Sequence, residues 1–315
     1  MTGSDPARRQ ALIAAHFSAL MFGMTGILGA LIRADAWVIT SGRAVFAALA
    51  LGLVSLWLRR PVFRDLRARQ VVALVLGGIV LAAHWVTFFL AVKAGGVAVA
   101  TLGFAAFPAF IALMDWLVFR ERIGGREWGL LGLVTLGLVL VTPSFDFGDQ
   151  GTVGLLWGLA SGFTFALLAM MNRRATRGVD AVQVSFWQNL VVALVLLPVV
   201  SWGSSPGGDH QAVAQGFGEL WALDWWYLGL LGILCTGLCH YLFVRSLDHL
   251  DARTVGMIVA LEPVYAIACA WWLFSAQPSG RMLLGGVLII LATVLSAQGR
   301  QQPDASSAVM NRPDS

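Results

Sequence analysis

Long apolar runs, separated by short polar segments, follow one another along the whole of this sequence. A transmembrane helix needs about 20 consecutive apolar residues to cross the hydrocarbon core of a bilayer. Ten runs approach or reach this length, near residues 11–32, 36–58, 70–92, 97–119, 126–142, 152–171, 182–202, 225–246, 253–274 and 280–298. Lipid offers no partner for exposed backbone groups, so such runs must fold as helices. We therefore predict an all-α polytopic membrane protein with ten transmembrane helices.

The composition excludes the soluble classes of protein. Of the 315 residues, 58% are hydrophobic and 12% are charged, whereas soluble domains carry about 25% charged residues. The net charge of +4 does not indicate a nucleic-acid partner, because the basic residues form short clusters between apolar runs rather than one patch. The spacing of Cys235, Cys239 and Cys269 matches no zinc site or disulfide framework. No Walker loop, dinucleotide fingerprint or metalloprotease signature is present, so we expect no metal, no cofactor and no enzyme.

The basic residues alternate from loop to loop. If the N-terminus is cytoplasmic, ten spans return the C-terminus to the cytoplasm, and 17 of the 21 basic residues then lie in cytoplasmic segments. The opposite side holds only Arg33, Lys93 and Arg281, and Arg43 lies inside the second span. Cytoplasmic loops of membrane proteins carry such an excess of Lys and Arg. The pattern predicts that both termini are cytoplasmic.

The two halves of the chain resemble each other. Residues 91–120 align with residues 246–275 at a constant offset of 155. The matching pairs are Pro108 with Pro263, Phe110 with Tyr265, Trp116 with Trp271, and Phe119 with Phe274. Five spans in each half give the halves opposite orientations, an arrangement typical of secondary transporters. We therefore predict two inverted five-helix repeats, at 1–145 and 146–300, followed by a disordered cytoplasmic tail at 301–315.

Over nearly its whole length the chain resembles the EamA-type branch of the drug/metabolite transporter superfamily. The stretches that carry the resemblance are Ala91 to Gly95 leading to Pro108, then Arg120 to Arg122, then Leu261 to Val264, with Arg43 early in the second span. Two positions depart from the pattern: Phe22 precedes Gly23 where a tryptophan is common, and Ser275 to Gln277 lack a frequent glutamate. The resemblance implies ten helices around a central cavity, transport of small metabolites such as amino acids, and a bacterial inner membrane.

Two residues that carry charge at membrane depth are the strongest site candidates, since such charges are costly and usually functional. Glu262 lies near the middle of the ninth run, directly before Pro263. Its carboxylate could bind a substrate ammonium or exchange protons, or it could be a neutral group that locks helices together. Arg43 could bind a substrate carboxylate, pair with Glu262, or extend its side chain to the membrane surface.

Two histidines occupy nearly equivalent positions in the halves. His84 precedes Trp85, and His240 precedes Tyr241. Histidine titrates near neutral pH and suits proton coupling, although an isolated histidine is more often a structural hydrogen-bonding residue. Trp85 and Tyr265 add aromatic surface to the predicted substrate site. Pro108 and Pro263 each interrupt a span, and we expect the two breaks to face each other across the site.

These features predict a secondary transporter of small organic metabolites, such as amino acids or their derivatives. We expect it to work as a proton-coupled exporter by alternating access. The alternative substrate is a drug or quaternary amine, which an acid among aromatic rings would bind. A non-transporting membrane protein or a membrane-embedded enzyme is disfavoured, because the ionisable groups stand in separate spans. Gly125, Gly129 and Gly132, with Gly285 and Gly286 at the matching place in the tenth span, predict close packing of the fifth and tenth spans, within one molecule or in a homodimer.

Overall fold

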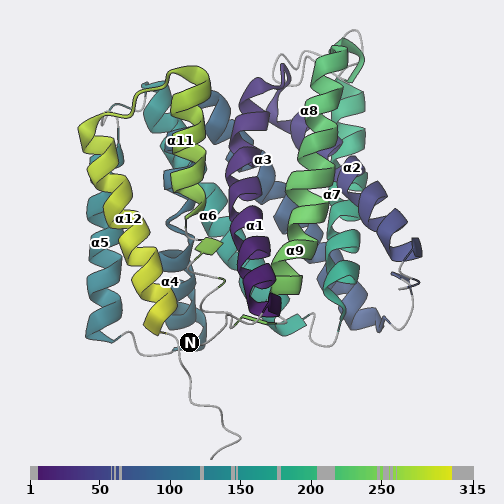
Figure 1. The fold of residues 1–315 in the computed structure, drawn as a ribbon, viewed down its shortest axis with the longest axis horizontal. Coiled ribbons are helices and arrows are strands. Elements are labelled where there is room, and N and C mark those ends of the chain that lie inside the picture. Colours follow the sequence, from purple (N-terminus) through teal and green to yellow (C-terminus); the bar gives the residue numbers. More distant parts are fainter. Residues whose placement is uncertain are drawn as a thin grey trace, which may run out of the picture.

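The fold is known from a computed structural model, and every regular element in its described part is helical (Figure 1). The described residues are 6–57, 59, 62–63, 66–120, 124–142, 146, 148–175, 179–203, 217–246, 249–250, 255, 258–259 and 261–299. The helices are α1 (Pro6–Leu31), α2 (Ala36–Trp57), α3 (Ala68–Phe104), α4 (Phe107–Phe119), α5 (Gly125–Val141), α6 (Gln150–Ala175), α7 (Ala181–Gly203), η1 (Phe217–Glu219), α8 (Ala222–Gly232), η2 (Ile233–Leu238), α9 (Cys239–Ser246), α11 (Glu262–Phe274) and α12 (Gly280–Gly299). The predicted tail at 301–315 lies outside these residues.

Six helical stretches of the described chain are long and apolar enough to cross a membrane, and two shorter apolar helices accompany them. The prediction of a polytopic all-α membrane protein is therefore confirmed. Helix ends follow the predicted runs closely: α7 covers Ala181–Gly203 against a predicted 182–202, and α12 covers Gly280–Gly299 against 280–298.

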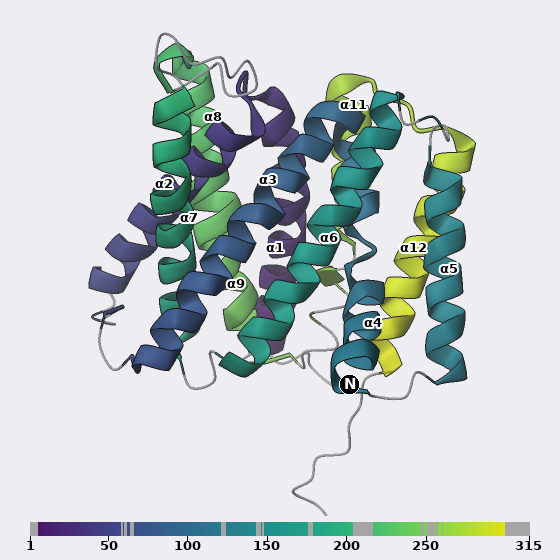
Figure 2. The ribbon, with the colours of Figure 1, turned by 180° about the vertical axis from the view of Figure 1, so that it is seen from behind.

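The element α3 contains a chain reversal at Gly96. Gly96 has φ 79° and ψ 171°, a conformation outside the helical region that glycine adopts without steric cost. Contacts with α6 show the directions of the two segments. Before Gly96, the contacts along α6 are Ala91 with Gly154 and His84 with Ser161; after it, they are Ala100 with Gly158 and Phe104 with Gly162. The first segment therefore runs antiparallel to α6 and the second runs parallel to it (Figure 2).

Two helices of equal length begin just before a proline. Helix α4 begins at Phe107 and α11 at Glu262, so that Pro108 and Pro263 are each the second residue of a 13-residue helix. Proline suits this position because its missing N–H has no partner in the first turn of a helix. The starts of α4 and α11 are 155 residues apart, as are their ends at Phe119 and Phe274.

Glycine allows α5 and α12 to pack closely. A Cβ atom on Gly285 would lie only 2.6 Å from the carbonyl oxygen of Gly137. The sequence prediction named the wrong glycines on α5. Nothing lies within 4 Å of a Cβ atom built on Gly125, Gly129 or Gly132, because these residues lie on the open side of the helix.

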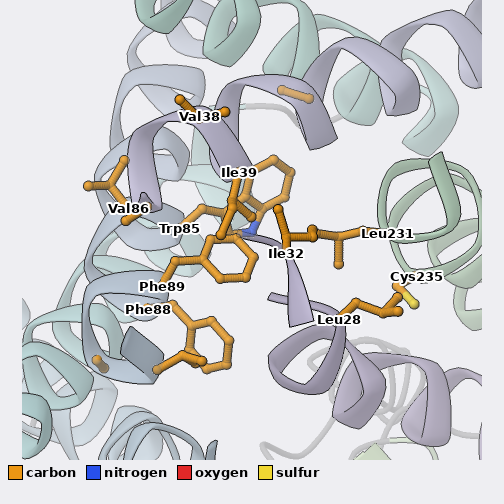
Figure 3. Close-up of a cluster of buried hydrophobic side chains, with 14 of the residues drawn as sticks. Leu28, Ile32, Val38, Ile39, Trp85, Val86, Phe88, Phe89, Leu231 and Cys235 are labelled. Carbon is orange, nitrogen blue, oxygen red and sulfur yellow. The ribbon is translucent and has the colours of Figure 1, made fainter. Parts of the chain in front are cut away.

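The largest hydrophobic cluster surrounds the second half of α1. Helix α1 lies between the α5–α12 pair and the group formed by α2, α7 and α8 (Figure 1). Close to the end where α1 passes into α2, the side chains of Ile32, Ile39 and Phe89 are fully buried between α1, α2 and α3 (Figure 3). We call this end of the bundle the Asp35 end, after the residue between α1 and α2.

Candidate functional site

Arg43 is buried inside α2 with 4% of its surface exposed. Its Nε donates a hydrogen bond to Thr236 Oγ1 at 2.8 Å. Its guanidinium carbon lies 3.9 Å from the centre of the Trp85 ring and 5.8 Å from that of Phe89. An arginine over an aromatic face gains a cation–π attraction, about 2 kcal/mol when desolvated. A hydroxyl and two aromatic rings therefore hold the Arg43 side chain inside the bundle, and it does not extend to the membrane surface.

Thr236 lies in η2, a turn of π-helix between α8 and α9. Its hydroxyl donates to the carbonyl oxygen of Leu231, five residues earlier, at 2.9 Å. The single hydroxyl proton is used in that bond, so Thr236 can act only as an acceptor toward Arg43. Single π-turns inside α-helices occur frequently at functional sites. Here the π-turn places a hydroxyl oxygen against a buried cation.

Gly232 lets α8 approach α2 closely enough for this contact. A Cβ atom at Gly232 would lie 2.6 Å from the carbonyl oxygen of Arg43 and 2.5 Å from the Cβ atom of Phe46. Any larger residue would push the two helices apart. Nε of Arg43 is bound to Thr236, and the guanidinium lies over the ring of Trp85. Within the described chain, the terminal amino groups of Arg43 donate no hydrogen bond. These groups can donate to a further acceptor, such as a carboxylate.

Glu262 stands in the first turn of α11, where a helix dipole favours a negative charge. Helix α1 touches this turn directly, because a Cβ atom on Gly23 would lie 3.1 Å from the carbonyl oxygen of Glu262. Three residues on, Tyr265 Oη lies 3.1 Å from His16 Nδ1 on α1. The structure thus places Glu262, Tyr265 and Arg43 around α1.

His84 belongs to a different group of contacts from its neighbour Trp85. His84 Nδ1 lies 3.0 Å from Ser161 O and 2.9 Å from Ser161 Oγ, and this pair joins α3 to α6. The imidazole also packs against the rings of Phe104 and Phe165, at centroid distances of 5.3 and 5.1 Å. These contacts suit a structural role. His240 lies in the first turn of α9, next to Cys239, whose thiol donates to Ser18 O on α1.

Pro108 is surrounded by different chemistry from Pro263. Its neighbour Phe107 stacks on Phe104 at 5.3 Å and contacts Phe165 edge-on at 5.1 Å. The break before Pro108 thus lies in an aromatic cluster, whereas the break before Pro263 carries a carboxylate.

Sequence reasoning missed Thr236 and Gly232. A threonine or glycine in an apolar run is unremarkable, and no local pattern predicts a π-turn. The one available signal was the four-residue spacing of Leu228 and Gly232, which places both on the face of α8 that contacts α2.

Known proteins resemble the chain in both sequence and fold. The model of the EamA-like transporter family matches residues 9–142 and 152–298. An uncharacterized transporter of Bacillus subtilis, YxxF, is 23% identical over 95% of this chain and 93% of its own length. The pseudopaline exporter CntI of Pseudomonas aeruginosa is 25% identical over 85% of this chain and 90% of its own length.

Two further likenesses are more distant or partial. The S-adenosylmethionine uptake transporter of Rickettsia felis is 24% identical over 63% of this chain and 62% of its own length. A protein of known crystal structure superimposes with a TM-score of 0.63 over 91% of this chain and 96% of its own, at 18% identity. That likeness concerns the fold alone.

Proposed function

Since the chain belongs to the EamA-like transporter family, we propose that it is a secondary transporter that exports small organic metabolites bearing a carboxylate, such as amino acids or their derivatives. The observation that carries this proposal is the buried Arg43, whose Nε donates to Thr236 and whose guanidinium lies over the ring of Trp85. Its terminal amino groups would bind a substrate carboxylate, and Glu262 would bind a substrate ammonium. Named relatives carry organic metabolites in both directions: one is an exporter of pseudopaline and one takes up S-adenosylmethionine.

A quaternary amine or cationic drug is the weaker candidate. Such a ligand needs an open aromatic face, and the Arg43 guanidinium already covers the ring of Trp85 at 3.9 Å. A second cation there would meet like-charge repulsion.

Protons are the proposed coupling ion. Glu262 would bind either a proton or a substrate ammonium, so that loading one side of the membrane with protons drives substrate the other way. His84 and His240 are weaker relay candidates, because His84 is already bound to Ser161 on α6.

The proposed architecture is ten crossing helices in two inverted five-helix halves, in a bacterial inner membrane with both termini in the cytoplasm. The equal lengths of α4 and α11 at an offset of 155 support the repeat. Cysteine at Gly218 should then react with an impermeant thiol reagent in intact cells, and cysteine at Arg67 should react only after the membrane is opened. The reverse result would invert the topology.

Flux measurements in proteoliposomes test the function. Purified protein, first screened by thermal shift against amino acids and quaternary amines, should move a labelled amino acid under an imposed pH gradient. Arg43→Gln should abolish that flux. Quaternary-amine flux that survives in Arg43→Gln, with no amino-acid flux in the wild type, would favour the cationic candidate instead.

A further inference from the structure

Three helices show the same order of residues from the Asp35 end toward Arg43. Successive members of each series are four residues apart, about 6 Å along a helix axis, except that Leu228 and Thr236 are eight residues apart. The three series are Asp35, Ile39 and Arg43 on α2; Lys93, Phe89 and Trp85 on α3; and Asp224, Leu228 and Thr236 on α8 and η2. Each series therefore passes from a charged residue through an apolar residue to a residue of the Arg43 site.

The charged residues at the end bind the segment between α1 and α2. Lys93 Nζ donates to the carbonyl oxygen of Ile32 at 2.6 Å, at the C-terminal end of α1. Asp224 Oδ1 accepts from the backbone N–H of Arg33 at 3.0 Å, and its Oδ2 accepts from that of Trp221 at 3.0 Å. Helices α3 and α8 thus hold the same short segment from two sides.

Asp35 completes the charged group. Its Oδ1 accepts from the N–H groups of Trp37 and Val38 at 2.8 and 2.9 Å, which caps the start of α2. Its Oδ2 is buried and has no hydrogen-bond partner within the described chain. The ammonium of Lys93 attracts both Asp35 and Asp224. Lys93 and Asp224 are thus each tied to the backbone between α1 and α2, and Asp35 lies within that same segment.

The apolar layer beneath is closed. Ile39, Phe89 and Leu228 are each 0% exposed. In Figure 3, Ile39 lies above the Phe89 ring, with Trp85 beside them. Water at the Asp35 end would have to pass this layer to reach Arg43, about 12 Å along α2 from Asp35.

We propose that Lys93, Asp35 and Asp224 form a latch that holds the Asp35 end of the transporter shut. In this conformation the latch and the apolar layer separate Arg43 from the solvent at that end. Opening requires Lys93 to leave the carbonyl oxygen of Ile32 and Asp224 to leave the N–H of Arg33, after which Ile39, Phe89 and Leu228 can part. The proposal concerns access to the site and does not depend on which substrate Arg43 binds.

The latch can be observed directly, because Lys93 is the only lysine in the chain. An amine-acylating reagent applied to purified protein in nanodiscs, where both ends are accessible, modifies one side chain, and site-resolved mass spectrometry separates it from the N-terminal amine. Asp224→Asn should raise the acylation rate of Lys93 about tenfold, which corresponds to roughly 1.4 kcal/mol. Asp149→Asn is the matched control, since Asp149 caps α6 through the N–H of Thr152 and does not touch Lys93. It should leave the rate unchanged.

A second readout probes the layer itself. Cysteine in place of Ile39 should react slowly with a hydrophilic thiol reagent in the wild-type background, and about five- to tenfold faster when Lys93→Met or Asp224→Asn is added. Fast reaction without those changes would mean that the end is not closed. Equal slow rates in all backgrounds would mean that the apolar layer closes the end alone. Either result overturns the latch, whereas loss of transport in Arg43→Gln concerns only the proposed function.

Discussion

The starts of α4 and α11 have the same backbone and different chemistry. Both helices have 13 residues and a proline at the second position. The residue before the proline is Phe107 in the first half, where it packs among Phe104 and Phe165. In the second half it is Glu262, a carboxyl group in the first turn of α11. The two halves share a helix break, and only one of them places an ionisable group there.

This difference indicates how two similar helix starts can have different roles. Each break leaves backbone groups without a helical partner, because the first turn of a helix that starts there has free N–H groups. Aromatic rings fill the first break, so it can serve as packing. A carboxylate in the second break would respond to protons or to a substrate cation. We therefore expect substitutions at equivalent positions to have unequal effects.

Glu262→Gln should have the largest effect. It keeps the size of the side chain and removes the charge, so flux driven by a pH gradient should fall about a hundredfold, the loss expected when a charged hydrogen-bonding partner is removed. Glu262→Asp should retain part of the flux. Phe107→Leu, the matched change in the first half, should alter flux less than about twofold. Equal losses at both positions, measured in proteoliposomes, would remove the asymmetry.

Thr236→Val should have the next largest effect. Valine keeps the shape and removes the oxygen that accepts from Arg43, so the KM of a carboxylate substrate should rise about tenfold while the expression level stays unchanged. Thr236→Ser should restore the wild-type KM. The equivalent position in the first half is Leu81, and Leu81→Val should leave KM unaltered. A KM that does not change in Thr236→Val would mean that Thr236 only supports the helix.

The prolines themselves should differ by a smaller factor. Alanine at Pro263 restores an N–H and lets α11 extend backward, which should displace Glu262 and slow flux about fivefold. Alanine at Pro108 should slow flux about twofold or less, since the aromatic rings around Phe107 tolerate the change. The thermal unfolding temperature of each variant serves as the folding control. A larger loss at Pro108 than at Pro263 would contradict the assignment of the working break to the second half.

The smallest expected effect concerns two aspartates that cap the second helix of each half. Asp35 caps α2, and exposed Asp180 caps α7 through the N–H of Val182. Burial raises the pKa of Asp35 above its ordinary value, against the lowering effect of the N–H groups of Val38 and Trp37 and of Lys93. The folded state then binds the proton more tightly than the unfolded state. Stability from this group is present at low pH and is lost as pH rises through the folded pKa.

Melting curves recorded between about pH 4 and pH 7 check the direction of this pH dependence. The range starts near the ordinary pKa of aspartate. Wild-type protein should gain stability relative to Asp35→Asn as the pH falls. The charged groups near Asp35 are Lys93, Asp224 and Arg33, so the Lys93→Met background should enlarge the effect. Parallel curves for wild type and Asp35→Asn would show that the carboxyl is not perturbed.

Much of the fold follows from hydrophobic pattern alone. Runs of apolar residues located α2, α7 and α12 to within a few residues, because in lipid the backbone has no alternative to the helix. The family predicted from Glu262, Pro263 and their companions is confirmed by the match over 9–142 and 152–298. Membership of this family identifies the protein as a transporter and not as an enzyme.

The site was less predictable, for physical reasons. Arg43 and Glu262 were predictable because a charge in an apolar run is expensive and therefore conspicuous. The contact between Arg43 and Thr236 was not, since it depends on the approach of α8 at Gly232 and on a π-turn. The reversal at Gly96 was predicted only as a gap between two spans, because many residues can end a helix and only the backbone angles reveal the turn.

The π-turn at Ile233–Leu238 also makes the chain sensitive to its own length. Before the turn, α8 is fitted to α2 through Gly232; after it, α9 is fitted to α1 through Cys239 and Ser18. One surplus residue in the turn reconciles two helix faces that a regular α-helix would rotate about 100° apart. Deleting a single residue here would force the segment to keep one partner and lose the other. Insertions and deletions should therefore be excluded from this stretch, although its individual side chains could vary.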